Sequence, residues 1–296
     1  TVMAQMTVAA ALGHQEADHW THHLQDTIKS GQELCNEKLS YLLCKNAPEK
    51  IRQMRDWKTD WANDNARIRQ GPAPGHGVKR CCYVDFLNTG PAVARTLRGE
   101  VAKLKNINRV SGLTIIDLVI EENQVIGAIG LNTETGKYVS IGAKTIILAA
   151  GGLTQLFARN SASKNMGGDS HALALRAGAN LMDMEFVQFF PIGHLAPRLV
   201  GMDPIMWDPF RYKLGGRLLN GHGEQFIENY GGDDGDAYTV GRDLAAYAIL
   251  KECEASRGSP NGGAWLSFQH LSKAELDEAF GPIIEKLSAN DIDLTK

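Results

Sequence analysis

The sequence has no long hydrophobic run, no excess of basic residues and few cysteines. No apolar stretch in its 296 residues approaches the roughly 20 residues of a membrane-spanning helix, so we expect no direct membrane insertion. The 31 Lys and Arg are balanced by 34 Asp and Glu, and the net charge of -3 argues against a nucleic-acid partner. The five cysteines, an odd number without C-x-x-C spacing, are typical of reduced thiols and predict a cytoplasmic protein.

Metal-ligand spacings are also scarce. The adjacent Cys81 and Cys82 would point to opposite faces of an extended segment, which argues against joint ligation. His19 and His23 stand four residues apart in HQEADHWTHH and could share a helix face, but no third ligand at a suitable spacing accompanies them. We therefore predict that the chain holds no metal.

What the sequence does contain is a succession of helical and strand-like segments. Apolar residues at three- and four-residue spacing predict helices within the first 70 residues, and the segment 89–105 predicts another. The residues expected on one buried helix face are Leu39, Leu42, Leu43, Ile51 and Met54. An irregular loop rich in Gly, Pro and Asn separates these helices. From about residue 110 to 150, β-branched segments alternate with turn residues and predict a β-meander that ends in a strand at 145–148.

The second half of the sequence returns to helices and loops. We predict a helix from about residue 170 to 178, and two more at 242–255 and 271–286. The composition becomes loop-rich after about residue 200, which places a domain boundary near residue 195. The predicted fold class is α/β, with a central sheet and helices, the inserted β-meander, and a smaller α+β domain after the boundary.

The run TIILAAGG, residues 145–152, is the clearest binding signal. Its apolar residues give way to Ala149, Ala150, Gly151 and Gly152, whose small side chains let a ligand lie against the main chain. In α/β folds, ligands bind beyond the carboxyl ends of strands. These four residues are therefore candidate contacts for a nucleotide or a flavin, and an ordinary turn is the alternative interpretation.

Several segments in a fixed order then carry a family resemblance. They include TVMAQ, DTIKSG, AKTIILAAGG, GGDSHALALRAGANLMDMEFVQFFP and GRDLAAYAILKECEASRG. Together they resemble the flavoprotein subunit of succinate dehydrogenase and fumarate reductase, a family that also includes L-aspartate oxidase. The resemblance implies FAD as the cofactor, a partial Rossmann-like FAD-binding domain over 1–194 and an incomplete capping domain over 195–296. It also implies hydride transfer between the flavin and a carbon–carbon bond next to a carboxyl or carbonyl group.

The same resemblance assigns roles to individual residues. Gly241-Arg242-Asp243 matches the family's G-R-D motif, so Arg242 is the implied proton shuttle; a surface Arg–Asp pair is the alternative. Thr1, Ala4 and Gln5 match a stretch that passes under the flavin ring. Asp169 matches an aspartate that fixes the loop beside the cofactor, and it could also cap the helix that begins near Ser170.

The sequence departs from the family pattern in its glycines. No G-x-G-x-x-G run occurs, because Arg80 and Phe226 occupy the third position after the two G-x-G pairs, Gly75/Gly77 and Gly221/Gly223. Met6 and Thr7 replace two glycines that follow the T-x-x-A-Q stretch in the family. We expect the phosphate-binding fingerprint and the C-terminal flavin contacts to lie outside these residues, in a longer flavoprotein of which this chain is the middle.

A further departure concerns the substrate. Phe190 stands in QFFP where members that bind dicarboxylates have histidine. His194 and Arg211 are candidate replacements, with ordinary polar roles as the alternative. The lost charge-assisted hydrogen bonds predict a saturated or unsaturated carboxylate substrate other than succinate, bulkier or less charged. An electron-transfer partner subunit belongs to the same expectation.

Two hypotheses of different classes follow. In the first, the chain belongs to an FAD-dependent oxidoreductase in which Arg242 moves the proton. In the second, it is a truncated, non-catalytic flavoprotein fold that binds a protein partner, an interpretation motivated by the missing fingerprint and the replaced substrate ligands.

Overall fold

The structure is a computed structural model that describes residues 7–73, 75–85, 88–158, 160, 162–189, 193, 195, 215–232, 242–281 and 283–295. The chain divides into two compact units, one made of Thr1–Glu100 and Gln188–Lys296, the other of Val101–Val187. The predicted boundary near residue 195, between an FAD-binding part and a capping part, stays a prediction.

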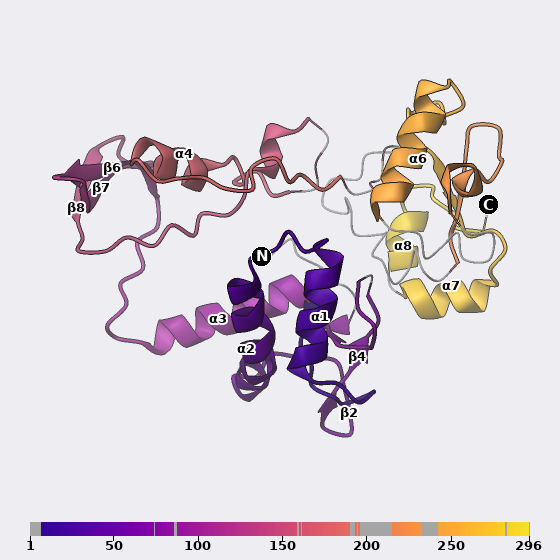
Figure 1. Ribbon diagram of the computed structural model, residues 1–296, viewed down its shortest axis with the longest axis horizontal. Coiled ribbons are helices and arrows are strands. Elements are labelled where there is room, and N and C mark those ends of the chain that lie inside the picture. Colours follow the sequence, from indigo (N-terminus) through magenta and orange to yellow (C-terminus); the bar gives the residue numbers. More distant parts are fainter. Residues whose placement is uncertain are drawn as a thin grey trace. The chain divides into compact units, whose positions relative to one another are not determined.

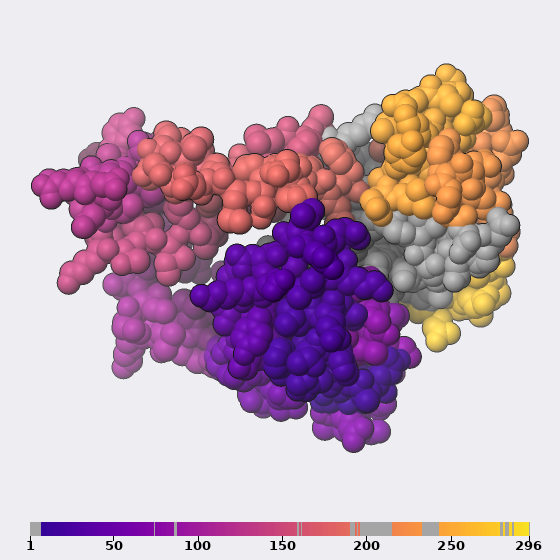
Figure 2. Space-filling model, viewed as in Figure 1, coloured from indigo at the N-terminus to yellow at the C-terminus, as the bar shows by residue number. Residues whose placement is uncertain are grey.

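Two helices dominate the N-terminal part, α1 (Trp20–Ser30) and α2 (Glu37–Asp56) (Figure 1). The side chain of Asn36 begins α2 by accepting a hydrogen bond from the backbone N–H of Leu39 (3.1 Å). In the space-filling view, the atoms of this part (indigo) form one closely packed body (Figure 2).

The predicted buried face of α2 is wrong in its first half. Leu39 and Leu43 are 63% and 64% exposed, and Leu42 is exposed as well, whereas Ser40, Cys44 and Ile51 are buried. Leu39 and Leu43 each precede a buried residue by one position, which is roughly 100° around a helix. The covered stripe is therefore narrower than the leucine spacing indicated.

Short strands complete the N-terminal part. They are β1 (Val8–Ala9), β2 (Asn63–Asp64), β3 (Arg67–Ile68), β4 (Gln70–Gly71) and β5 (Cys81–Cys82), followed by α3 (Thr89–Lys103). The first sheet has the antiparallel order β1-β5-β4, and β2 pairs with β3, so the predicted irregular loop contains strands. The buried core of this part is Ala10, Leu12, Ile51, Trp61, Ile68, Cys82, Val84 and Ala92.

The second unit is built on the predicted β-meander. Its strands β6 (Leu113–Glu121), β7 (Gln124–Asn132) and β8 (Tyr138–Gly142) pair in the antiparallel order β6-β7-β8. Glu122 and Asn123, with φ of 47° and 62°, make the two-residue turn between β6 and β7. The Asn132 side chain accepts hydrogen bonds from the backbone N–H groups of Glu134 (3.0 Å) and Thr135 (2.9 Å) and shapes the next turn.

The predicted strand at 145–148 is not a strand in the structure. The segment runs as irregular chain after β8 (Figure 1), and among the described residues no strand pairs with it. Ile147 is 86% exposed and Leu148 is 37% exposed. The apolar, β-branched run has the composition of a strand, but a strand also needs a neighbour that exchanges hydrogen bonds with it.

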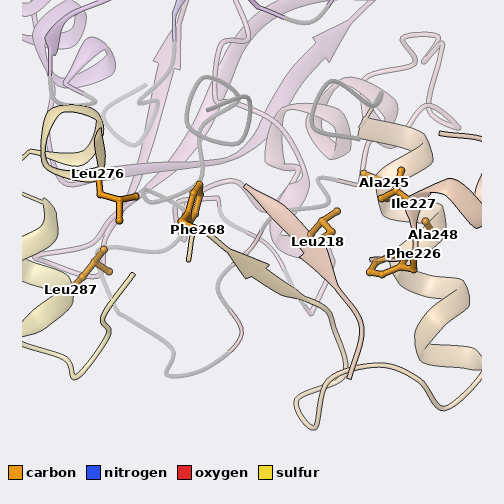
Figure 3. Close-up of a cluster of buried hydrophobic side chains, with 8 residues drawn as sticks. All are labelled: Leu218, Phe226, Ile227, Ala245, Ala248, Phe268, Leu276 and Leu287. Carbon is orange, nitrogen blue, oxygen red and sulfur yellow. The ribbon is translucent and has the colours of Figure 1, made fainter. Parts of the chain in front are cut away.

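The C-terminal part combines a two-stranded sheet with helices. Its elements are β9 (Arg217–Leu219), the 3-10 helix η3 (Ile227–Tyr230), α6 (Arg242–Glu254), β10 (Trp265–Ser267), α7 (Lys273–Phe280) and α8 (Ile283–Ser288). The predicted helix 271–286 is therefore two helices, which Gly281 separates with its φ of 47°. Figure 3 shows the buried cluster of this part: Leu218, Phe226, Ile227, Ala245, Ala248, Phe268, Leu276 and Leu287.

None of the described helices has the length and apolar character of a membrane span.

Candidate functional site

Two glycine-containing segments of the second unit meet at the start of α4 (Asp169–Arg176). The backbone N–H of Gly168 donates to the carbonyl of Gly152 (3.1 Å), and the backbone N–H of Ala150 donates to Ser170 Oγ (3.0 Å). The segment 149–152 is thereby fastened to the first turn of a helix, a position where backbone N–H groups face solvent or a ligand.

The glycines are required where these segments touch. Gly151 and Gly168 have φ of 88° and 85°, a conformation that residues with a Cβ rarely adopt. A Cβ on Gly168 would lie 3.1 Å from Leu153 Cβ, and one on Gly152 would lie 3.3 Å from Met166 Cε. A larger residue at 168 would therefore push the segments apart, whereas at 152 the flexible end of the Met166 side chain would have to shift by a few tenths of an ångström.

A β-bulge holds α4 in place against the meander. The register of β6 and β7 shifts between Ile115 and Asp117, so Ile116 is left out of the ladder. Arg176, in the last turn of α4, donates through Nη2 to the Ile116 carbonyl (2.8 Å), and its Nε lies 3.4 Å from Asp117 Oδ1. The predicted meander thus positions the helix that carries the site.

The exposed strip of main chain fits the cofactor that the resemblance implies. Ala149, Ala150 and Gly151 are exposed and Gly152 is half-buried, so nothing larger than a methyl group projects from four consecutive residues. A flat or phosphate-bearing ligand can therefore approach the backbone there. These are the four residues that the sequence singled out.

Asp169 differs from its predicted capping role. The helix begins at Asp169 itself, its N-cap is Gly168, and no side chain makes a capping hydrogen bond. Because Asp169 is already inside the first turn, its carboxylate favours the positive end of the helix without accepting from the cap N–H groups. Its side chain is exposed, and the role beside the cofactor stays a prediction.

Gly168 and Ser170 were not predicted as site residues. The sequence shows a glycine pair directly before Asp169 and a serine hydroxyl directly after it. Their partner, the segment 149–152, lies about 20 residues earlier in the chain, so no local pattern joins the two. His171 was also missed: its Nδ1 is buried without a hydrogen-bond partner in the described part of the chain.

The remaining predicted residues are only partly placed. Arg242 is the first residue of α6, so it stands at a helix N-terminus as the G-R-D match implied, but its side chain lies outside the described structure. The other flavin and substrate candidates lie wholly outside the described residues: Thr1, Ala4, Gln5, Phe190, His194 and Arg211. The structure therefore tests none of these six.

Two histidines of the N-terminal part lie in a polar cluster: His76 Nδ1 is 3.3 Å from Arg80 Nη1, and the His23 and His76 ring centroids are 5.6 Å apart. His19 Nδ1 accepts weakly from the backbone N–H of Thr21 (3.5 Å) at the start of α1, whereas His23 is buried one turn further on. Among the described residues, no three His, Cys, Asp or Glu side chains are grouped as a metal would require.

Arg80 is the centre of that cluster. Its guanidinium, 1% exposed, donates to Asp18 Oδ2 (3.0 Å) and Oδ1 (3.1 Å) and to Asp26 Oδ2 (2.6 Å). Asp26 also accepts from the backbone N–H of Gly77 (2.8 Å). Gly75 and Gly77, which have the spacing of a dinucleotide fingerprint, thus belong to a loop held by a buried ion pair.

Comparisons with known proteins identify the family. The model of the family described as FAD binding domain matches residues 1–295. An uncharacterized FAD-dependent oxidoreductase of Methanocaldococcus jannaschii is 32% identical over 297 residues, covering 100% of this chain and 53% of that protein. One subunit of the fumarate reductase (CoM/CoB) of Methanothermobacter marburgensis is 31% identical over 257 residues, covering 86% of this chain and 46% of that protein.

A solved structure agrees with these relatives. Mycobacterium smegmatis Sdh1 in complex with UQ1 has a TM-score of 0.84 and 29% identity, covering 100% of this chain and 51% of that chain. The fold and the resemblance predicted from the sequence are thus confirmed, as is the FAD-binding family. The chain spans about half the length of the curated relatives it matches. With its AAGG strip fastened to α4, this chain belongs to the FAD-binding domain family that includes the succinate dehydrogenase and fumarate reductase flavoproteins.

Proposed function

We propose that the protein containing this chain is an FAD-dependent oxidoreductase of the fumarate reductase and succinate dehydrogenase type. The observation that supports this proposal most is the hydrogen bond between Gly168 and Gly152. It holds the exposed main chain of residues 149–152 beside α4, in a member of an FAD-binding family. Bound FAD would supply the hydride chemistry, at a carbon–carbon bond next to a carboxyl or carbonyl group.

The residues of this chain would bind the FAD and orient it toward the substrate. The strip 149–152 would lie against the cofactor, with Thr1, Ala4 and Gln5 beneath the flavin and Asp169 beside it. Residues 1–194 would form the FAD-binding part, and 195–296 the capping part that closes over the substrate. The five free thiols favour a reducing compartment such as the cytoplasm.

Arg242 would move the proton that accompanies the hydride. An arginine has an ordinary pKa above ~12, so it acts as an acid only where water is excluded and neighbouring groups favour the transfer. Its place at the first residue of α6 supports the G-R-D match.

The substrate would be a carboxylate other than succinate, since Phe190 replaces the expected histidine. His194 and Arg211 are the candidates to hold its carboxylate. The names of the relatives, which include one subunit of a fumarate reductase, favour an electron-transfer partner.

The decisive experiment measures catalysis by the complete flavin-loaded protein. Dithionite reduces the flavin anaerobically, and a panel of α,β-unsaturated mono- and dicarboxylates is tested for reoxidation. We expect one of them to reoxidise the flavin, and Arg242→Lys to slow that step by at least 100-fold. Glu254→Gln, an exposed position at the other end of α6 and outside the G-R-D motif, is the control and should change the rate less than threefold. An Arg242→Lys protein as fast as the unmodified protein would refute the proton-shuttle role.

A further inference from the structure

A buried carboxylate at the far end of α6 is not used by the proposed chemistry. Glu252 is 1% exposed and stands in the last turn of the helix whose first residue is Arg242. Glutamate is seldom buried unless it is paired, so its place needs a reason.

Four hydrogen bonds from three side chains satisfy Glu252. Its Oε1 accepts from Tyr230 Oη (2.7 Å) and Arg257 Nη2 (2.7 Å), and its Oε2 accepts from Arg257 Nε (3.0 Å) and Asn220 Nδ2 (3.1 Å). The two-pronged Arg257 contact is the strongest and most directional kind of pair. The donors hold the pKa of Glu252 at about 2, with Arg257 as the main cause, so the group stays charged.

The donors come from segments that the backbone also ties to α6. The backbone N–H of Gly221 donates to the Arg257 carbonyl (2.7 Å), and a Cβ on Gly221 would lie 2.3 Å from the Gly258 carbonyl oxygen. The Gly221/Gly223 pair, which has the spacing of a dinucleotide fingerprint, therefore serves close packing beside the end of α6.

Elsewhere in the described part of α6, the contacts with the rest of the protein are mainly apolar or aromatic: Ile249 packs against the same buried cluster, and the Tyr247 ring meets the Tyr230 ring edge to face, with the ring centroids 6.1 Å apart. Figure 3 shows Ala245 and Ala248, both fully buried, beside Phe226 and Ile227. Alanine methyl groups fix the distance between a helix and its neighbour but resist sliding and rotation weakly, because they do not interlock deeply. The directional contacts of Glu252 supply what the alanines lack.

We propose that Glu252 is a positioning residue for Arg242, acting through α6. Glu252 follows Arg242 by ten positions, about 15 Å along the helix, so a tilt of about 4° at the Glu252 end displaces the first turn by about 1 Å. A displacement of that size can cost about 100-fold in rate when it misaligns a reacting group. The catalytic part of this inference rests on the proposed function of Arg242.

The test compares two glutamates of the same helix in the complete, flavin-loaded protein. Glu252→Gln keeps the shape and removes the charge, whereas Glu254→Gln makes the same change at an exposed residue paired with Lys251 (2.7 Å). Hydrogen exchange is measured over residues 245–249, the first amides of α6 that have acceptors within the helix. We expect at least tenfold faster exchange there in Glu252→Gln and no change in Glu254→Gln. Faster exchange confined to residues 250–258 would overturn the inference.

Steady-state kinetics distinguish a positioning role from a purely structural one, because a purely structural role would not change the solvent isotope effect. We expect Glu252→Gln to lower kcat by 10- to 100-fold with KM changed less than threefold, and to raise the solvent isotope effect on kcat, because proton transfer becomes limiting. A fall in kcat without a larger isotope effect would overturn the positioning role. If Arg242→Lys proves fully active, the proposed function fails, and the exchange measurement still decides the coupling.

A second variant keeps the test usable if Glu252→Gln does not fold. Tyr230→Phe removes one hydrogen bond to Oε1 and leaves the Arg257 pair in place. We expect the same changes in exchange and isotope effect at about a third of the size, and unchanged exchange at residues 245–249 would contradict the inference.

Discussion

At the scale of single residues, the most unusual environment is that of His23 on α1. Its side chain is 4% exposed, and its Nδ1 is buried without a hydrogen-bond partner in the described part of the chain. The His76 ring lies 5.6 Å away, and Arg80, Asp18 and Asp26 are the charged groups around it. Burial, with smaller contributions from Arg80 and His76, lowers its pKa from 6.5 to about 4.

This lowered pKa predicts acid sensitivity. Between pH 6.5 and 4 the unfolded chain protonates His23 while the folded chain does not, so the free energy of unfolding is highest above pH 6.5 and falls as the pH approaches 4. The loss is at most about 3–4 kcal/mol, since one pKa unit corresponds to about 1.4 kcal/mol. Urea unfolding at pH 7.5, 5.5 and 4.5 measures it.

His23→Gln separates this effect from the other titrating groups. The variant should lose less free energy of unfolding over the same pH range, whereas His22→Gln, at an exposed position of the same helix, should follow the unmodified protein. Equal pH slopes for the His23→Gln and unmodified proteins would show that His23 does not titrate in this way.

At the scale of elements, the β-meander contains a close backbone approach at Gly127. Gly127 of β7 stands opposite Gly142 of β8 in the ladder. A Cβ on Gly127 would lie 2.3 Å from the Ile141 carbonyl oxygen, whereas one on Gly142 would meet nothing within 4 Å. The two glycines are therefore a matched pair for substitution: a side chain at 127 would clash with the neighbouring strand, and a side chain at 142 would not.

We predict opposite outcomes for the two alanine substitutions. Gly127→Ala should cost about 1–3 kcal/mol, as overpacking does, and speed amide exchange in β7 and β8. Gly142→Ala should be neutral or stabilise by up to about 1 kcal/mol, because alanine restricts the unfolded chain. Thermal unfolding and hydrogen exchange check both, and equal losses in the two variants would contradict the steric explanation.

Elements with local signals could be predicted from the sequence. The meander, α3 and α4 follow from β-branched runs, turn residues and helical spacing, and each lies within a few residues of its prediction. The strand at 145–148 and the buried leucine face of α2 fail because they depend on neighbours. The pattern of apolar residues indicates which side chains a segment can bury. It does not indicate which face of that segment a neighbouring segment covers.

The candidate site shows the same limit. Residues 149–152 were predicted as ligand contacts because a run of alanine and glycine can be read directly from the sequence. The contact of Gly152 with Gly168, and of Ala150 with Ser170, joins segments about 16 to 20 residues apart, and no local spacing announces it. Glu252 was missed for the same reason, since its donors come from three separate segments.

At the scale of the whole molecule, family membership and local geometry support one account. The FAD-binding domain model matches residues 1–295, and the chain spans about half the length of its curated relatives. The sequence has no G-x-G-x-x-G run, and among the described residues the segment 149–152 with α4 is the flavin contact that we propose. The central claim is therefore that this contact takes part in holding FAD.

The measurement that tests this claim most directly is the flavin content of the complete protein, from its visible absorbance, in two alanine variants. Gly168 and Gly178 both have φ of 85° at the two ends of α4, but only a Cβ on Gly168 meets a neighbour, Leu153 Cβ at 3.1 Å. We predict that Gly168→Ala lowers the FAD content or raises its Kd at least tenfold, while Gly178→Ala retains FAD. A folded Gly168→Ala protein that binds FAD as tightly as Gly178→Ala does would contradict the account.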